Sequence, residues 1–159
     1  MKSNPERAKA LVEQFGSGRE SLLPILQQVV REDQYLNSVV LEDLAKAMHL
    51  SAADVYGTAS FYSFLDTEPR GEHIIRICKT ITCYMKGKDA LVAAIEERLK
   101  IRMGETTRDG QFSLLAANCM GWCHKGPAML IDDQVYTELT PERAVAIIER
   151  FMQDRRIRA

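Results

Sequence analysis

The cysteine spacing of this 159-residue chain constrains its fold more than any other feature. The cysteines form two close pairs, which are Cys78 with Cys83 and Cys119 with Cys123. Four residues separate the first pair, three separate the second, and 35 residues lie between them. Each pair follows a short segment that predicts a strand, residues 73–77 and residues 112–117. If these strands are neighbours in one sheet, the loops after them meet and four thiols converge.

The first 65 residues carry a helical pattern throughout. Apolar side chains recur at helical spacing in four stretches, which begin near residues 5, 21, 38 and 51. Asn4 has the features of an N-cap, and Ser51 with Asp54 has the spacing of a capping box. Residues 66–72 are polar and contain Pro and Gly, which is typical of a linker. We therefore expect an N-terminal helical domain over residues 1–68 and a second domain over residues 69–159.

The pattern of the second domain is mixed. Strands are predicted over residues 73–77, 112–117, 128–131 and 134–138, and helices over residues 88–100 and from residue 141 onward. The last two strands form a hairpin across Asp132 and Asp133. This order predicts an α/β domain with a mixed sheet covered by helices. The expected fold class is α+β, a helical bundle followed by this α/β domain.

Charge and hydropathy argue against a nucleic-acid partner and against membrane insertion. Lys plus Arg total 21 and Asp plus Glu 22, for a net charge of −1, whereas phosphate-binding proteins usually carry a basic surplus. No apolar run approaches the ~20 residues that a bilayer requires. The first six residues lack the apolar stretch of a secretion signal, so we expect a cytoplasmic location. In that reducing compartment, cysteines more often bind metals or act in catalysis than form disulfides.

Among metal sites, a [2Fe–2S] cluster held by four thiolates suits this spacing best, because plant-type ferredoxins also begin with C-x4-C. Structural zinc accepts four cysteines but typically uses shorter C-x2-C elements. A zinc-stabilised interaction module remains the alternative from a different class. A C-x-x-C dithiol is absent, and the three histidines are not placed as Rieske ligands. Positive charge near such a site is expected from Lys79, Lys86, Lys88 and Lys125.

Several short segments resemble a known family. Around the cysteines they are residues 77–83 (ICKTITC), 118–123 (NCMGWC) and 126–128 (GPA), and in the helical half residues 21–28 (SLLPILQQ) and 55–62 (VYGTASFY). In these segments the chain resembles the thioredoxin-like [2Fe–2S] ferredoxins. The resemblance implies a thioredoxin-like second domain with one cluster, ligated by Cys78, Cys83, Cys119 and Cys123. Trp122 departs from the family, which often has a small residue there.

The resemblance also implies a function, that of an electron-transfer subunit in a larger flavin- and NAD(H)-dependent oxidoreductase. A soluble NAD-linked hydrogenase, including the electron-bifurcating type, is the first expectation. The 24 kDa-type subunit of respiratory complex I and a subunit of an NAD-dependent formate dehydrogenase are the alternatives. By resemblance, FMN and NAD are bound by a partner subunit, and a further catalytic subunit is expected.

No substrate chemistry is expected on this chain alone, because it has neither a dinucleotide fingerprint nor a Walker motif. Contact with the partner is expected through the cysteine loops, where apolar Met85 and Trp122 are flanked by lysines.

Overall fold

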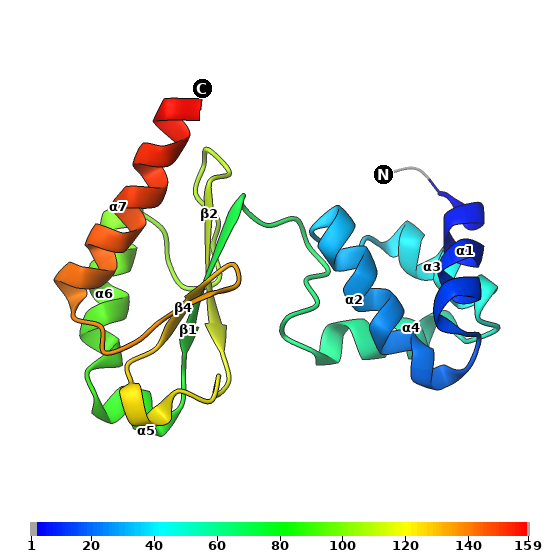
Figure 1. Cartoon of the computed structure of the whole chain (residues 1–159), viewed down its shortest axis with the longest axis horizontal. Helices are drawn as coiled ribbons and strands as arrows, with labels where there is room; N and C mark the ends of the chain where they lie inside the picture. The colour runs from blue at the N-terminus through cyan, green and yellow to red at the C-terminus, as the bar shows by residue number, and fades with distance from the viewer. Residues whose placement is uncertain (1–2, 159) are drawn as a thin grey trace. The chain divides into compact units, whose positions relative to one another are not determined.

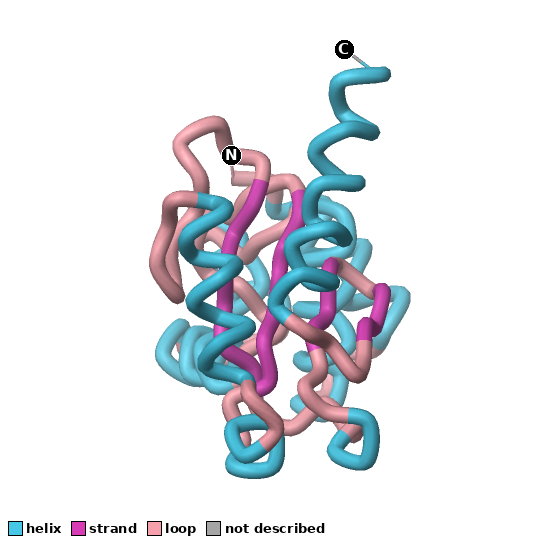
Figure 2. Tube along the Cα trace, turned by 90° about the vertical axis from the view of Figure 1, so that its left-hand side faces the viewer, coloured by secondary structure: helices cyan, strands magenta, loops and turns pink. Residues whose placement is uncertain are grey.

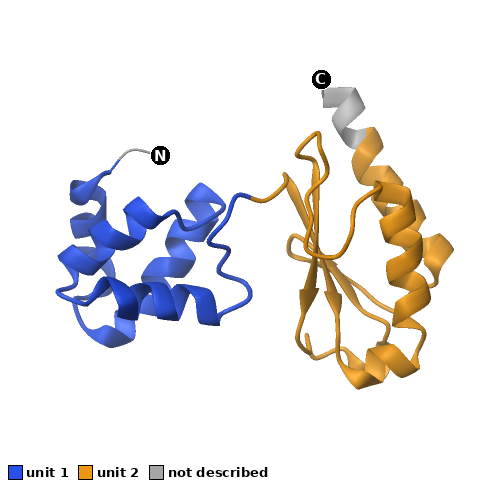
Figure 3. Cartoon of the chain, turned by 180° about the vertical axis from the view of Figure 1, so that it is seen from behind, with its two compact units in different colours: residues 1–69 blue, residues 70–159 orange. Residues whose placement is uncertain are grey.

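The computed structural model describes the backbone of residues 3–158 and the side chains of residues 3–153. The chain divides into two compact units, residues 1–69 and residues 70–159 (Figure 1, Figure 3). Each unit has its own hydrophobic core. The predicted α+β fold class is confirmed, because helices precede a mixed sheet.

The described residues of the first unit form a helical bundle. Its elements are α1 (Pro5–Phe15), the 3₁₀ turn η1 (Arg19–Ser21), α2 (Leu22–Asp33), α3 (Ser38–Ala47) and α4 (Ala52–Phe61). Three of these helices begin at polar caps, because the side chains of Asn4, Asn37 and Ser51 each accept a hydrogen bond from the N–H three residues later. Ile25 of α2 and Leu44 of α3 are fully buried in the core between the helices.

The second unit is a four-stranded sheet with two long helices on one face, as Figure 2 shows. Its elements are β1 (His73–Cys78), α5 (Ile81–Met85), α6 (Lys88–Leu99), β2 (Phe112–Ala117), η2 (Cys123–Lys125), β3 (Met129–Ile131), β4 (Gln134–Tyr136) and α7 (Pro141–Arg158). The strand order is β2-β1-β3-β4, in which β1 and β2 are parallel and the other pairs are antiparallel. The predicted mixed sheet and its hairpin are therefore confirmed.

The core of the second unit lies between the sheet and its helices. Ile75 of β1 and Leu114 of β2 are fully buried, as are Leu91 and Ile95 of α6 and Ile148 of α7. None of the helices formed by the described residues is long and apolar enough to cross a membrane. The expected cytoplasmic location stays a prediction.

Gly71 fixes the backbone where the chain enters the second unit. Its N–H donates a hydrogen bond to the Ser113 hydroxyl at 2.8 Å. A Cβ added at Gly71 would lie 2.8 Å from the carbonyl carbon of Phe112, so only glycine fits this close backbone approach. The predicted linker therefore ends in backbone that is packed against the start of β2.

Candidate metal centre

Both cysteine pairs lie at one end of the sheet. Cys78 at the end of β1 is paired in register with Ala117 at the end of β2. The carboxyl ends of adjacent parallel strands meet at the same edge of a sheet, which is where ligand sites commonly form. The loops that follow β1 and β2 therefore lie at the same end, as Figure 2 shows below the strands.

The first loop buries both of its cysteines. Cys78 is the last residue of β1, and Cys83 lies in α5, for which Thr80 is the N-cap residue. The exposed fractions of Cys78 and Cys83 are only 2% and 1%. The Cys78 thiol is 3.1 Å from the Thr80 hydroxyl, so the two groups share a hydrogen bond. This loop therefore shields two thiols from water.

The second loop is more open. Cys119 is exposed and Cys123 is half-buried. Their sulfur atoms lie 3.2 Å apart, and the N–H of Gly121 donates to the Cys119 sulfur at 3.4 Å. The centre therefore has one buried side, on the first loop, and one side that is accessible from solvent.

Hydrogen bonds from both loops act on the buried thiols. Burial raises the pKa of the Cys78 thiol, but hydrogen bonds from Thr80 and from the N–H of Met120 outweigh it, so this pKa is lowered overall. Burial also raises the pKa of the Cys83 thiol, and the neighbouring Cys78 raises it further. Met120 belongs to the second loop, so groups from both loops contact the buried thiol of Cys78.

The cysteines also interact electrostatically across the two loops. The pKa of the Cys123 thiol is raised by its hydrogen bond with Cys119, by burial, and by the charges of Cys119, Cys78 and Cys83. Four thiolates this close repel one another, and bound metal ions remove that repulsion.

The thiols form two pairs rather than one tetrahedron. Within the part of the chain that the structure describes, no three His, Cys, Asp or Glu side chains are grouped so that they could hold one metal ion. A single tetrahedral zinc ion requires four ligands around one point, whereas a [2Fe–2S] cluster has two irons held by four cysteines. The observed pairs are Cys78 with Cys83 and Cys119 with Cys123.

The lysines predicted near the site contact different groups. The Lys86 ammonium donates to the carbonyl oxygens of Cys123 and His124, both at 3.1 Å. Lys88 instead pairs with the neighbouring Asp89 at 2.8 Å. The two remaining lysines, which are exposed, are Lys79 and Lys125.

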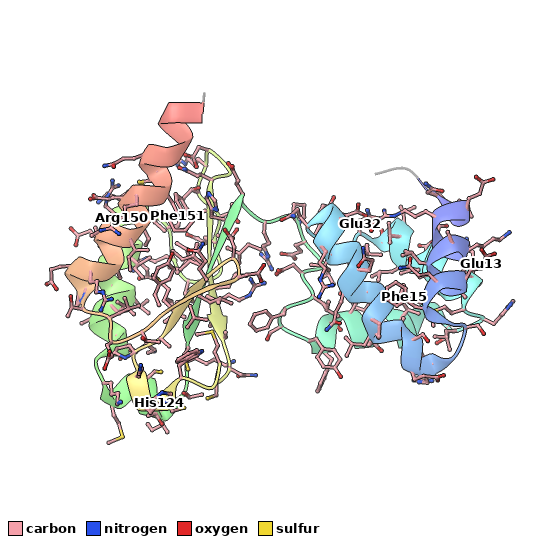
Figure 4. All side chains as sticks on the ribbon, viewed as in Figure 1. Glu13, Phe15, Glu32, His124, Arg150 and Phe151 are labelled. Carbon is pink, nitrogen blue, oxygen red and sulfur yellow. The ribbon has the colours of Figure 1, made fainter. Side chains whose placement is uncertain are left out.

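Exposed apolar side chains stand on the same two loops, and we call them the apolar collar. They are Ile81, Tyr84, Met85 and Trp122, with exposed fractions of 68%, 55%, 79% and 38%. The Trp122 ring stacks on His124 with centroids 5.9 Å apart, and Figure 4 labels His124 at this end of the second unit. Sequence analysis missed Ile81 and Tyr84, because α5 is too short to leave a periodic signal.

Comparisons with known proteins find a family match over most of the chain. The family model for thioredoxin-like [2Fe–2S] ferredoxins matches residues 8–152. An NADH-quinone oxidoreductase subunit of Escherichia coli (strain K12) is 36% identical over 133 residues, which cover 84% of this chain and 80% of the relative. The NADH-quinone oxidoreductase subunit of the same kind from Pseudomonas aeruginosa is 33% identical over 134 residues, which cover 84% and 81%.

A solved structure also matches most of the chain. The NAD⁺-reducing [NiFe]-hydrogenase in its H2-reduced state aligns with a TM-score of 0.71 and 26% sequence identity. The match covers 83% of this chain but only 22% of the hydrogenase chain, so this protein corresponds to a small part of that longer polypeptide.

Proposed function

The chain belongs to the thioredoxin-like [2Fe–2S] ferredoxins, and we propose that four cysteines hold its cluster within an NAD(H)-linked oxidoreductase. The proposed ligands are Cys78, Cys83, Cys119 and Cys123. The observation that carries this assignment is the convergence of four interacting thiols at the ends of β1 and β2. A bound [2Fe–2S] cluster supplies one-electron chemistry. The chain is then an iron–sulfur subunit that transfers electrons.

In this assignment each pair of cysteines would hold one of the two irons. The Thr80 hydroxyl next to Cys78 and the Gly121 N–H that points to Cys119 stabilise the ligand thiolates. Hydrogen bonds to ligand sulfurs tune the potential of such centres. The first pair is buried whereas Cys119 is exposed, so electrons are expected to enter or leave through the second loop.

The similar proteins support two kinds of parent complex, and the names of both mention NADH or NAD⁺. The curated relatives are NADH-quinone oxidoreductase subunits, and the alignment spans 80% of the Escherichia coli protein. This agreement in length favours a subunit of that type as the first candidate, although sequence analysis placed a hydrogenase first. An NAD⁺-reducing hydrogenase is the second candidate, favoured by the TM-score of 0.71. The formate dehydrogenase alternative stays a prediction.

A flavin-bearing partner follows from the electron count. NADH delivers a hydride, which carries two electrons, whereas the cluster accepts one electron at a time. A flavin can accept two electrons and release them singly, and the sequence carries no motif for binding flavin or NAD. We therefore assign FMN and NAD to a partner subunit. The apolar collar beside the exposed Cys119 supports docking of that partner against the cluster.

The test compares NADH oxidation by this chain alone and by this chain with its flavin-bearing partner. The partner is first identified by purifying the native complex and sequencing its subunits. With an artificial electron acceptor, the isolated chain should not oxidise NADH, and reduction of its cluster by NADH should require the partner. Turnover of NADH by the flavin-free isolated chain would contradict the proposal, because it would require a nucleotide site on this chain.

A further inference from the structure

We propose that Lys86 is a positioning residue that fastens the first cysteine loop to the second and thereby sets the cluster's stability and potential. This inference rests on the proposed function, because it assumes that Cys83 and Cys123 are ligands. Lys86 lies directly after α5, at the end of the first loop. The residue is neither a cysteine nor a member of the apolar collar.

The contacts of Lys86 reach both loops. Its backbone N–H donates to the carbonyl oxygen of Cys83 at 3.2 Å. Its side-chain ammonium donates to the carbonyl oxygens of Cys123 and His124, each at 3.1 Å. One residue therefore joins a ligand of the buried pair to a ligand of the open pair.

The carbonyl groups that Lys86 binds belong to η2, the short turn that begins at Cys123. Carbonyl groups at the end of a helical turn have no partner within the turn, and a lysine ammonium can donate to them because its positive charge is attracted to their partial negative charges. The hydrogen bonds from Lys86 therefore restrain the backbone of Cys123, from which its thiol projects.

Gly126 provides the space for this bridge. A Cβ added there would lie 3.3 Å from the Lys86 side-chain carbon Cδ, 3.3 Å from the Cys83 sulfur and 3.7 Å from the Cys123 carbonyl oxygen. The φ of Gly126 is −70°, which any residue can adopt, so the constraint at this position is space. A side chain at Gly126 would therefore crowd both Lys86 and Cys83, whereas glycine leaves room for them.

Two measurable consequences follow for the cluster. The hydrogen bonds between the two loops resist separation of the loops, and iron can leave only when the loops separate. Loss of these hydrogen bonds should therefore speed iron release. A positive charge beside the ligand loops also favours the reduced cluster, which carries one more negative charge, so its loss should lower the midpoint potential. Lys86 is exposed, so solvent moderates both effects.

Lys88 offers a matched control. It is a lysine on the same side of the second unit, but its ammonium pairs with Asp89 and lies 5.8 Å from the centroid of the Tyr84 ring. Lys88→Met therefore removes the same charge as Lys86→Met without removing a bond between the two loops. Lys86→Arg keeps both the charge and the capacity to donate to carbonyl groups.

The experiment uses the full chain with its cluster and measures two quantities for each variant. These are the rate of iron transfer to a coloured chelator and the midpoint potential from an EPR-monitored redox titration. Lys86→Met should release iron on the order of tenfold faster than the wild type and have a lower potential than Lys88→Met. Lys86→Arg should have an iron-release rate and a midpoint potential near those of the wild type.

The proposal is overturned if Lys86→Met releases iron no faster than Lys88→Met, or if its potential is unchanged. Either result leaves the proposed function intact, because the wild-type chain still holds its cluster. A wild-type chain that contains no iron and no sulfide would instead refute the proposed function itself. The two failures are therefore distinguishable in one set of preparations.

Discussion

Replacing Gly71 with alanine should destabilise the second unit and leave the first unchanged. The added Cβ would lie 2.8 Å from the carbonyl carbon and 2.9 Å from the nitrogen of Phe112, and these backbone atoms cannot rotate away as a side chain can. Overpacking of this kind costs about 1–3 kcal/mol. The shift also weakens the hydrogen bond to Ser113, which contributes about 1 kcal/mol. The free energy of unfolding of the second unit should therefore fall by about 2–4 kcal/mol.

Urea unfolding measures this change. The single tryptophan of the chain, Trp122, lies in the second unit, so its fluorescence follows that unit alone. With a denaturant slope of about 1–2 kcal/mol per M, the midpoint of the Trp122 transition should fall by about 1–4 M.

Gly57→Ala is the matched control for Gly71→Ala. Gly57 lies inside α4, and nothing stands within 4 Å of an added Cβ. This variant should stabilise the helical unit by about 0.5–1 kcal/mol without moving the Trp122 transition. An unchanged Trp122 midpoint in Gly71→Ala would refute the reasoning about the close backbone approach.

Two further predictions concern the proposed domain division and Trp122. A fragment of residues 70–159 should assemble the cluster, because all four proposed ligands lie within it; a soluble fragment that cannot be reconstituted would show that the helical unit is required. Trp122→Ala should retain the cluster but change its potential or its sensitivity to oxygen, because this residue lies between two proposed ligands in the sequence and its ring stacks on His124. Trp122→Ala should also speed iron release less than about tenfold, which is the effect expected when a group that orients a ligand is removed. Identical potential and oxygen sensitivity in the variant and the wild type would make Trp122 inert packing.

Elements that depend on local chemistry were predictable from the sequence. Asn4 and Ser51 cap helices because each side chain reaches an N–H only three residues away. The two parallel strands, β1 and β2, were recognised for a similar reason, since short segments bounded by turn residues carry the signal themselves. The cysteine positions after both strands then indicated where the thiols would meet.

Features that depend on contacts distant in the sequence were not predictable. Five residues are too few to form a stable helix by themselves, so α5 depends on its surroundings in the folded unit. Gly71 and Ser113, which meet where the backbone approaches β2, are 42 residues apart in the sequence. The contact between Lys86 and the carbonyl of Cys123 links loops 37 residues apart, and the sequence predicted only a positive charge there.

The most direct test of the central claim is analysis of the metal and sulfide content of protein purified without oxygen. The account predicts about two irons and about two acid-labile sulfides per chain, together with a single spin-half EPR signal on reduction, because four thiolates hold one [2Fe–2S] cluster. Stoichiometric zinc in native protein, with neither iron nor sulfide, would contradict it and favour a zinc-stabilised module.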